Sequence, residues 1–481
     1  MTYSKNIPAI FSFLLPKPHK LDSPHVVLAL GLAGISLGQA LQHGDGFLNA
    51  SSLFYLTLAL IFLGWGLFAV PAFGQSFFSR IAFPILLLGL VLQIYQLTFT
   101  YVGDYQFLSL LPTLWQLRLL VLVAGGFALL SLAPQKWVPS ASRNGLTLLA
   151  LTVNGLAGVW VIQQAPTPFI DVFVYHQNSG WALAHGIDPY SLTTANIYGD
   201  LGKYGYGAEL FQGDVLNISN PYPPLSIYIS SLGYFMGGDI RYSHLFVFIL
   251  SCALIAFLHP GRGTKLAAYV FLFTPKSLYV IEQSWTEPIV VFLLVVVVYA
   301  YLHRSRWLEI LVGLFFASKQ YLLFAFPLVL MIFQIQTPFF RWFRRMSIIA
   351  LTALLVTAPL ALWNINSFLW NVGEAQWYQP FRLDALSYLS AYARVSGTEP
   401  TSLIAFAALA FALYLSWRNL PRTIEGFAAA FAFSMAIFFA FNKQAFCNYY
   451  FLVIGTISCT WAVIQSKEPF EELKESPVST Y

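Results

Sequence analysis

The sequence predicts an all-α polytopic membrane protein, a transmembrane helix bundle of about 13 or 14 spans with a large extracytoplasmic loop. Composition is the first reason: 58% of the 481 residues are hydrophobic and only 9% are charged, whereas a soluble domain carries about 25% charged residues. Long apolar runs are the second reason, because they recur from Pro24 to Gln465 with only short polar breaks. A soluble enzyme, a disordered chain and a disulfide scaffold are therefore excluded.

The individual spans follow from the apolar runs, since a helix needs about 20 mostly apolar residues to cross a bilayer. Five candidates precede the longest polar interval, at residues 25–42, 53–71, 81–102, 114–133 and 145–164. The others follow it, at 223–238, 242–259, 264–281, 286–303, 307–333, 346–364, 401–418, 423–441 and 446–465. None shows the period-two alternation of barrel strands, so the spans are helices.

Basic residues set the orientation, because cytoplasmic loops carry an excess of Lys and Arg. They gather before the first span, after the second and after the fourth, at Lys5, Lys17, Lys20, Arg80, Lys136 and Arg143. That side is therefore cytoplasmic. It holds an N-terminal segment, residues 1–24, and a tail, residues 466–481. The polar intervals at about 166–222 and 364–400 become outer loops.

Two topologies are open for the middle of the chain. If every apolar run from 223 to 333 crosses once, four basic residues face outward: Arg262, Lys265, Arg304 and Arg306. If 223–259 crosses only once in net, these residues return to the cytoplasm. The run 307–333 then splits near Lys319-Gln320 into two short helices. We favour the second topology because it obeys the charge bias throughout.

The 166–222 loop opens with an acidic residue, Asp171, almost directly after the fifth span. It is either a helix cap or interfacial charge, or a general base, because a carboxylate shielded from water has a raised proton affinity. Asp188 stands before a proline and is expected mainly to hold a turn. His176 either serves acid–base work or substrate binding, or is an ordinary interfacial histidine.

Short motifs connect these loops with a known family. The 166–222 loop contains Asp-x-x-Val-Tyr at 171–175 and Gly-x-Asp-Pro-Tyr at 186–190, and Tyr-Pro-Pro-Leu follows at 222–225. Residues 282–288, 317–320 and 442–450 agree in order and membrane side. Together they resemble integral membrane glycosyltransferases of the GT-C superfamily, above all family 87, which includes polyprenyl-phosphate-mannose-dependent mannosyltransferases. The resemblance covers about residues 145–465.

The resemblance implies a GT-C-like catalytic membrane module over 145–465, with Asp171 as the catalytic base. The chain departs from the family at its beginning. The family usually places this loop after its first span, whereas here a four-helix membrane extension, residues 25–144, comes before the module. Four extra spans are an even number, so the loop stays on the same side. The sequence assigns this extension no role.

A negatively charged lipid phosphate needs cations at membrane depth, and an unpaired charge there is costly. Lys319, Lys443 and Arg382 are therefore candidates, although Lys443 also suits an interfacial anchor and Arg382 a surface pair with Asp384. Trp285 belongs either to a sugar site with its flanking glutamates or to the membrane's aromatic belt. The full set of candidate binding residues is Tyr175, His176, Asp188, Tyr222, Glu282, Gln283, Trp285, Glu287, Lys319, Arg382, Asp384, Lys443, Gln444, Asn448 and Tyr449.

Together, residues and resemblance predict a hexosyltransferase of a bacterial plasma membrane, acting on its outer face. It would move a hexose, with mannose the leading guess, from a polyprenyl phosphate to a hydroxyl of a glycan, lipid or protein, with inversion. No Asp-x-Asp or clustered His/Asp motif appears in the outer loop, so we expect no metal and no cofactor besides the lipid-linked sugar. We also expect no nucleic-acid partner.

The alternative is a transporter or lipid-sugar flippase without covalent chemistry. Such a protein needs ionisable residues in mid-helix along a pathway. Five of the twenty acidic residues instead fall between Asp171 and Asp214, which favours a site beside the membrane.

Overall fold

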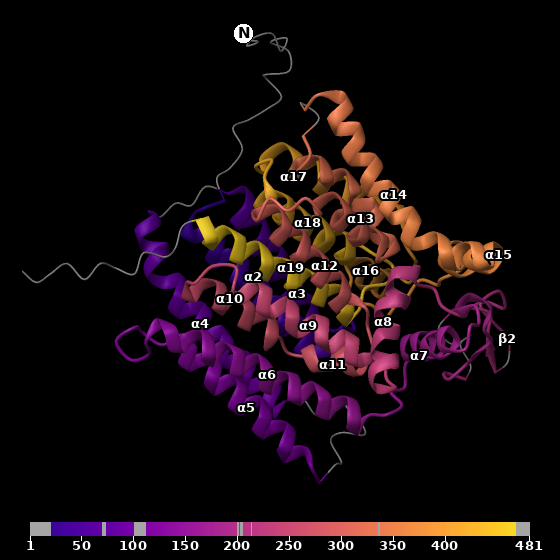
Figure 1. Cartoon of the computed structure of the whole chain (residues 1–481), viewed down its shortest axis with the longest axis horizontal. Helices are drawn as coiled ribbons and strands as arrows, with labels where there is room; N and C mark the ends of the chain where they lie inside the picture. The colour runs from indigo at the N-terminus through magenta and orange to yellow at the C-terminus, as the bar shows by residue number, and fades with distance from the viewer. Residues whose placement is uncertain are drawn as a thin grey trace, which may run out of the picture.

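The computed structural model describes residues 21–69, 74–100, 112–199, 202, 205–212, 214–334 and 337–467. They form a helical bundle (Figure 1), which confirms the predicted all-α class. Most of the predicted N-terminal segment and tail lie outside the described residues. The N-terminal helices are α2 (Pro24–Gly44), α3 (Ala50–Phe68), α4 (Gln75–Phe99), α5 (Leu114–Ser131) and α6 (Ser140–Gln164).

The middle of the chain contains the 166–222 loop and a series of shorter helices. The loop holds α7 (Asp171–Ala184), η3 (Pro189–Ser191) and a small antiparallel sheet of order β1-β3-β2, with β1 at Thr194–Ala195, β2 at Phe211–Gln212 and β3 at Val215–Leu216. It is followed by α8 (Pro224–Gly237), α9 (Arg241–Ala256), α10 (Arg262–Leu272), α11 (Ser277–Glu282), α12 (Glu287–Leu302), α13 (Leu308–Ala317) and the 3₁₀ helix η5 (Gln320–Met331).

The last third begins with α14 (Phe339–Trp363), which leads into the 364–400 loop. This loop folds into α15 (Ile365–Phe368), the π-helix η6 (Leu369–Gly373), η7 (Glu374–Gln376) and α16 (Tyr388–Ser396). The chain ends in α17 (Leu403–Asn419), α18 (Ile424–Ala440) and α19 (Cys447–Lys467).

Seven of the described helices are long and apolar enough to cross a membrane: α2, α3, α4, α5, α6, α14 and α19. An eighth candidate span is the pair α8 and α9, and five shorter apolar helices accompany them. The chain is therefore an integral membrane protein. The number of spans, 13 or 14, stays a prediction.

Two breaks interrupt the helices in the middle of the chain, and the choice between the two topologies stays a prediction. Helices α8 and α9 are bent by 110° against each other, so 223–259 is not one straight span. The run 307–333 is interrupted at Lys319, which is extended between α13 and η5. The predicted helix over 264–281 is wrong in one respect: α10 ends at Leu272, because Pro275 cannot donate a helical hydrogen bond and Lys276 has a φ of +70°.

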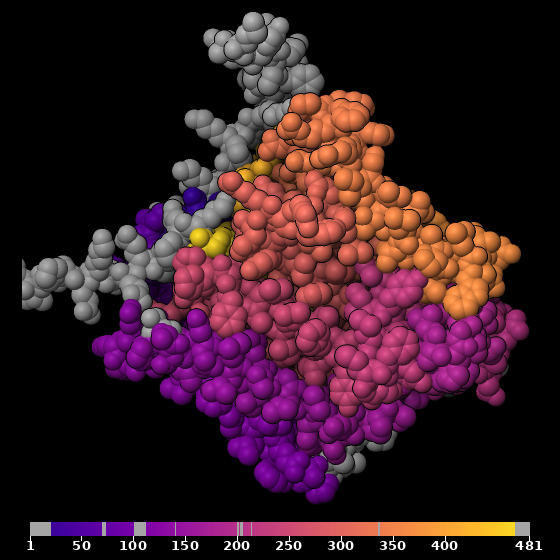
Figure 2. All heavy atoms as spheres, in the orientation of Figure 1, coloured from indigo at the N-terminus to yellow at the C-terminus, as the bar shows by residue number. Residues whose placement is uncertain are grey.

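The first helix of the N-terminal extension, α2, is part of the core of the bundle. Helix α2 is buried over 83% of its apolar window and packs against α19, α3 and α4, and both α2 and α19 lie inside the bundle (Figure 1). Helix α14 is buried over only 17% of its window. Figure 2 shows α14 in orange along the upper right edge and α5 and α6 in violet along the lower edge. Apolar faces of these outer helices are left to the lipid.

The turn between α2 and α3, residues 45–48, contains a glycine that the fold requires. Gly46 has a φ of +86°, and a Cβ there would overlap the backbone nitrogen of Cys447. Gly186 has a similar φ of +68° but lies in open space. Substitutions at the two glycines can therefore separate the cost of left-handed backbone strain from the cost of steric overlap.

We expect Gly46→Ala to destabilise the protein by about 2–5 kcal/mol, since left-handed strain adds to overpacking. Gly186→Ala, the matched control, should cost only the strain, about 1–2 kcal/mol. Unfolding of both variants in the same detergent measures the difference. Equal losses for the two variants would contradict the close approach of the α2–α3 turn to α19.

Candidate functional site

A cavity of about 960 Å³ lies where the 166–222 loop, the 364–400 loop and several helix ends meet. Its wall combines the α2–α3 turn, the start of α7, the α11–α12 turn, the start of η5 and the α18–α19 turn. Segments far apart in the sequence therefore share one hollow. Six charged side chains lie on its wall among many aromatic ones: Asp45, Asp171, Lys319, Arg382, Asp384 and Lys443.

Asp171 is the first residue of α7 and lies half-buried on this wall. Pro166 and Pro168 separate α7 from α6, because proline disfavours helix continuation. The Oδ1 atom of Asp171 accepts the N–H of Val172 at 2.8 Å and the hydroxyl of Tyr198 at 3.3 Å. The carboxylate also lies at a helix N-terminus, where negative charge is favourable.

Burial raises the pKa of Asp171 above its ordinary value. Hydrogen bonds from Val172 and Tyr198 and the positive charge of Arg382 act in the opposite direction, and burial dominates. The carboxylate is therefore a better proton acceptor than an exposed aspartate, and a cation lies within electrostatic reach.

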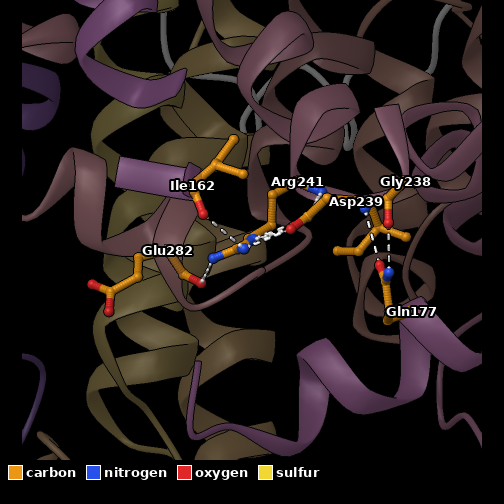
Figure 3. Close-up of polar contacts among 7 residues, drawn as sticks. Ile162, Gln177, Gly238, Asp239, Arg241 and Glu282 are labelled. Carbon is orange, nitrogen blue, oxygen red and sulfur yellow. Dashed lines mark hydrogen bonds and ion pairs between the residues drawn. The ribbon is translucent and has the colours of Figure 1, made fainter. Parts of the chain in front are cut away.

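A polar network fixes α7 from the side (Figure 3). Gln177 of α7 donates to and accepts from backbone groups of the α8–α9 turn, at 2.7 and 3.2 Å. In that turn, the fully buried Arg241 pairs with Asp239, with a shortest N–O distance of 2.5 Å. Arg241 also donates to the carbonyl oxygens of Ile162 and Glu282, at 3.2 and 3.4 Å. Helices α6, α7, α9 and α11 are thereby held together.

Arg382 supplies a fixed positive charge from the 364–400 loop. Its Nε and Nη2 atoms donate to the two carboxylate oxygens of Asp384 at 2.8 and 2.7 Å. The guanidinium lies 4.9 Å from the ring centre of Phe446 and interacts with the hydroxyl of Tyr206. The two hydrogen bonds to Asp384 hold the guanidinium plane in one orientation.

Lys443, in the α18–α19 turn, is a second cation of the wall. Its Nζ donates to the carbonyl oxygen of Gln379 at 2.5 Å, and no carboxylate of the described residues forms an ion pair with it. Burial lowers the pKa of Lys443. The N–H of Arg382 donates to the carbonyl oxygen of Lys443 at 3.1 Å, so the backbone holds these two cations close together.

Lys319 is also on the wall, but it is tied to a buried carboxylate. Its Nζ donates to Glu287 at 2.8 Å and to the hydroxyl of Thr286 at 2.5 Å. The ammonium lies 4.4 Å from the ring centre of Tyr222, and Tyr321 donates to the same Glu287 oxygen at 3.3 Å. This lysine is therefore engaged in holding η5 against α12.

The structure brings most of the predicted site residues together. Those lining the cavity are Asp171, Tyr175, Tyr222, Gln283, Trp285, Lys319, Arg382, Asp384, Lys443, Gln444, Asn448 and Tyr449. The structure places these residues on the wall of one cavity, whereas the role of each residue stays a prediction.

Four predicted residues do not line this cavity. His176 is buried behind it, with its ring 4.8 Å from that of Tyr222. Asp188 accepts the N–H of Tyr190 at 3.0 Å and caps η3, which is the turn role expected of it. Glu282 is buried in α11, and Glu287 lies behind Lys319.

Sequence reasoning missed several residues on the wall. Asp45 and Phe47 come from the N-terminal extension, to which the sequence assigned no role. Tyr198 and Tyr206 belong to the 166–222 loop, where recurring tyrosines were the one available signal. Gln320 lines the cavity directly after Lys319 and donates to the carbonyl oxygen of Pro221.

Fold and site together define an integral membrane helix bundle with a cavity of mixed charge. Within the described ranges no three His, Cys, Asp or Glu side chains are grouped so as to hold a metal ion, and metal independence stays a prediction. No protein-family model and no curated protein matches the sequence.

One solved structure is similar to this chain: the crystal structure of ArnT from Cupriavidus metallidurans bound to undecaprenyl phosphate. The sequences are 14% identical and the TM-score is 0.42. The match covers 70% of this chain and 61% of that chain. At this level the likeness does not assign an activity to the protein.

Proposed function

We propose that this protein is a membrane glycosyltransferase that takes its sugar from a polyprenyl-phosphate donor. One observation carries the proposal: a half-buried carboxylate of raised pKa, Asp171, shares a cavity of about 960 Å³ with Arg382 and Lys443. The resemblance of the loop motifs to the GT-C superfamily supports the same reading. The finer assignments, a hexose with mannose as the leading guess, inversion, and an extracytoplasmic site, belong to the proposal.

In the proposed reaction the acceptor hydroxyl attacks the anomeric carbon of the sugar. Asp171 takes the hydroxyl proton, the new glycosidic bond forms, and the bond to the phosphate oxygen breaks. The polyprenyl phosphate leaves with the bonding electron pair, and its charge is stabilised by Arg382 and Lys443. A single displacement inverts the anomeric carbon. The lipid-linked sugar is the only co-substrate that this scheme requires.

An apolar part of the wall suits the lipid chain. Phe324 of η5, Phe406 of α17 and Phe438 of α18 line the cavity and contact one another in edge-on or tilted geometry, with ring centres 5.1 to 6.0 Å apart. The first two are 44% and 41% exposed, so a bound ligand has apolar surface to cover there. A polyprenyl chain lying in the bilayer would reach the cavity along these rings while its phosphate meets the cations.

The test is a transfer assay with the full chain in nanodiscs and a radiolabelled polyprenyl-phosphate hexose. Covalent transfer of label to a hydroxyl acceptor from the native envelope supports the proposal. Movement of labelled lipid across vesicles without any covalent change would instead identify the flippase alternative. Absence of both transfer and lipid-phosphate binding would refute the proposed function.

The hydrogen bond from Tyr198 predicts a shift in the pH dependence of transfer. Asp171 acts as a base only when ionised, so the rate falls as pH drops through its pKa. Tyr198 donates to the ionised form and lowers this pKa. Tyr198→Phe should therefore move the acid limb of kcat/KM to higher pH, by about 0.5–1 unit for a bond of this length.

The matched control is Tyr299→Phe on α12, whose ring stacks on His303 outside the cavity. Its pH profile should coincide with that of the wild type. An acid limb that does not move in Tyr198→Phe, or that moves to lower pH, would show that Asp171 does not control it.

A further inference from the structure

The turn between α2 and α3 forms one side of the cavity and is joined to the loop that bears Arg382. The N–H of Leu48 donates to the carbonyl oxygen of Asp384 at 2.8 Å, and the N–H of Leu386 donates to that of Gly46 at 3.2 Å. Arg394 of α16 adds a bond to the carbonyl oxygen of Leu48 at 3.1 Å. The N-terminal extension therefore supplies backbone that fixes the position of the Arg382–Asp384 pair.

Asp45 in this turn presents a carboxylate to the cavity. It lies 2.7 Å from the Nζ of Lys276, whose side chain is fully enclosed, whereas 13% of the Asp45 side chain stays exposed. Asp45 lines the cavity and Lys276 does not. The ion pair fixes the position of the carboxylate, while its cation does not line the cavity. A ligand that lies beside the α2–α3 turn thus meets a hydrogen-bond acceptor.

Aromatic rings line the same cavity as Asp45, and one of them contacts the cation Arg382. Phe446 lies between Phe47, at 5.7 Å, and the guanidinium of Arg382, at 4.9 Å. Tyr279 and Trp285 form an edge-on pair at 5.2 Å on the same cavity wall. The cavity wall therefore combines a cation, aromatic rings and a carboxylate. A sugar attached to a phosphate can use all three: its phosphate meets the cation, its C–H faces meet rings and its hydroxyls meet the carboxylate.

We propose that Asp45 accepts a hydrogen bond from a hydroxyl of the donor sugar, so that the N-terminal extension forms part of the sugar subsite. This inference rests on the proposed function and extends it to a segment outside the family resemblance. A carboxylate repels phosphate, so the lipid phosphate stays at Arg382 and Lys443 and the sugar extends toward the α2–α3 turn. The N-terminal extension thereby contributes to recognition of the donor sugar and not to recognition of the lipid.

The test compares the binding of two probes, undecaprenyl phosphate and undecaprenyl-phosphate mannose, to the full chain in nanodiscs. Asp45→Asn should weaken binding of the sugar-bearing lipid about 10- to 100-fold, because a hydrogen bond to a charged acceptor is lost. Binding of the bare lipid phosphate should stay within about threefold. Asp214→Asn, an exposed aspartate of the 166–222 loop outside the cavity, should change neither affinity.

Three results distinguish the possible failures. If the wild type binds neither lipid, the proposed function falls and the sugar subsite falls with it. If bare lipid phosphate binds and Asp45→Asn leaves both affinities unchanged, or lowers both equally, only the sugar subsite is overturned. If Asp45→Asn does not fold, the wild type is photolabelled with a donor whose sugar carries a diazirine. Labelling of residues 45–48 supports the subsite, and labelling confined to other segments overturns it.

Discussion

Replacing Asp171 by Asn is expected to lower the rate of sugar transfer about 10²- to 10⁴-fold, the usual contribution of a general base. The side-chain amide keeps the shape of the carboxylate, and its oxygen still accepts from Val172 and Tyr198, so α7 should fold as before. Only the capacity to take a proton is lost. Binding of undecaprenyl phosphate should not weaken, because one negative charge near Arg382 has been removed.

The measurement is kcat for a labelled polyprenyl-phosphate hexose, with lipid-phosphate affinity determined on the same preparation. Asp214→Asn is the matched control, since it makes the same chemical change on the same loop at an exposed site that does not line the cavity. A variant at Asp171 that binds the lipid and transfers at more than half the wild-type rate would remove Asp171 from the mechanism.

Hydrophobic runs predicted the helices well because a membrane span is set by length and apolarity alone. The run 423–441 is α18 at Ile424–Ala440, and 114–133 is α5 at Leu114–Ser131. The break of 264–281 was missed for a physical reason. The left-handed backbone of Lys276 is accompanied by an ion pair with Asp45. That partner lies in the α2–α3 turn, more than 200 residues earlier in the chain, and no local pattern indicates it.

The candidate site was predictable where polar residues interrupt apolar sequence, as at Asp171 and Lys443. It was not predictable where function depends on which polar residues meet. The sequence proposed Glu287 and Lys319 as two separate ligands, but the structure shows one ion pair. It treated the extension as a separate unit, but the α2–α3 turn lies against the loop of Arg382. Pairing of this kind is a tertiary property.

The Glu287–Lys319 pair predicts the largest loss of stability. Glu287 is fully buried, and Lys319 is the cation beside it, at 2.8 Å. Lys319→Met should cost about 3–5 kcal/mol of unfolding free energy, because it leaves a buried carboxylate without its counter-charge. The double variant Glu287→Gln with Lys319→Met should recover most of this loss, since neither residue then carries a charge.

Lys443→Met is the matched control, because it removes the other lysine of the cavity wall. No carboxylate of the described residues pairs with Lys443, so its loss should cost less than about 1 kcal/mol of stability while weakening binding of undecaprenyl phosphate. The double variant at 287 and 319 should also be close to the wild type in stability, but with binding of undecaprenyl phosphate preserved. All three proteins are compared by unfolding in detergent and by titration with undecaprenyl phosphate. These measurements distinguish Lys319, which stabilises the fold, from Lys443, which binds the phosphate. If Lys319→Met proves as stable as Lys443→Met, the buried pair does not hold η5 against α12.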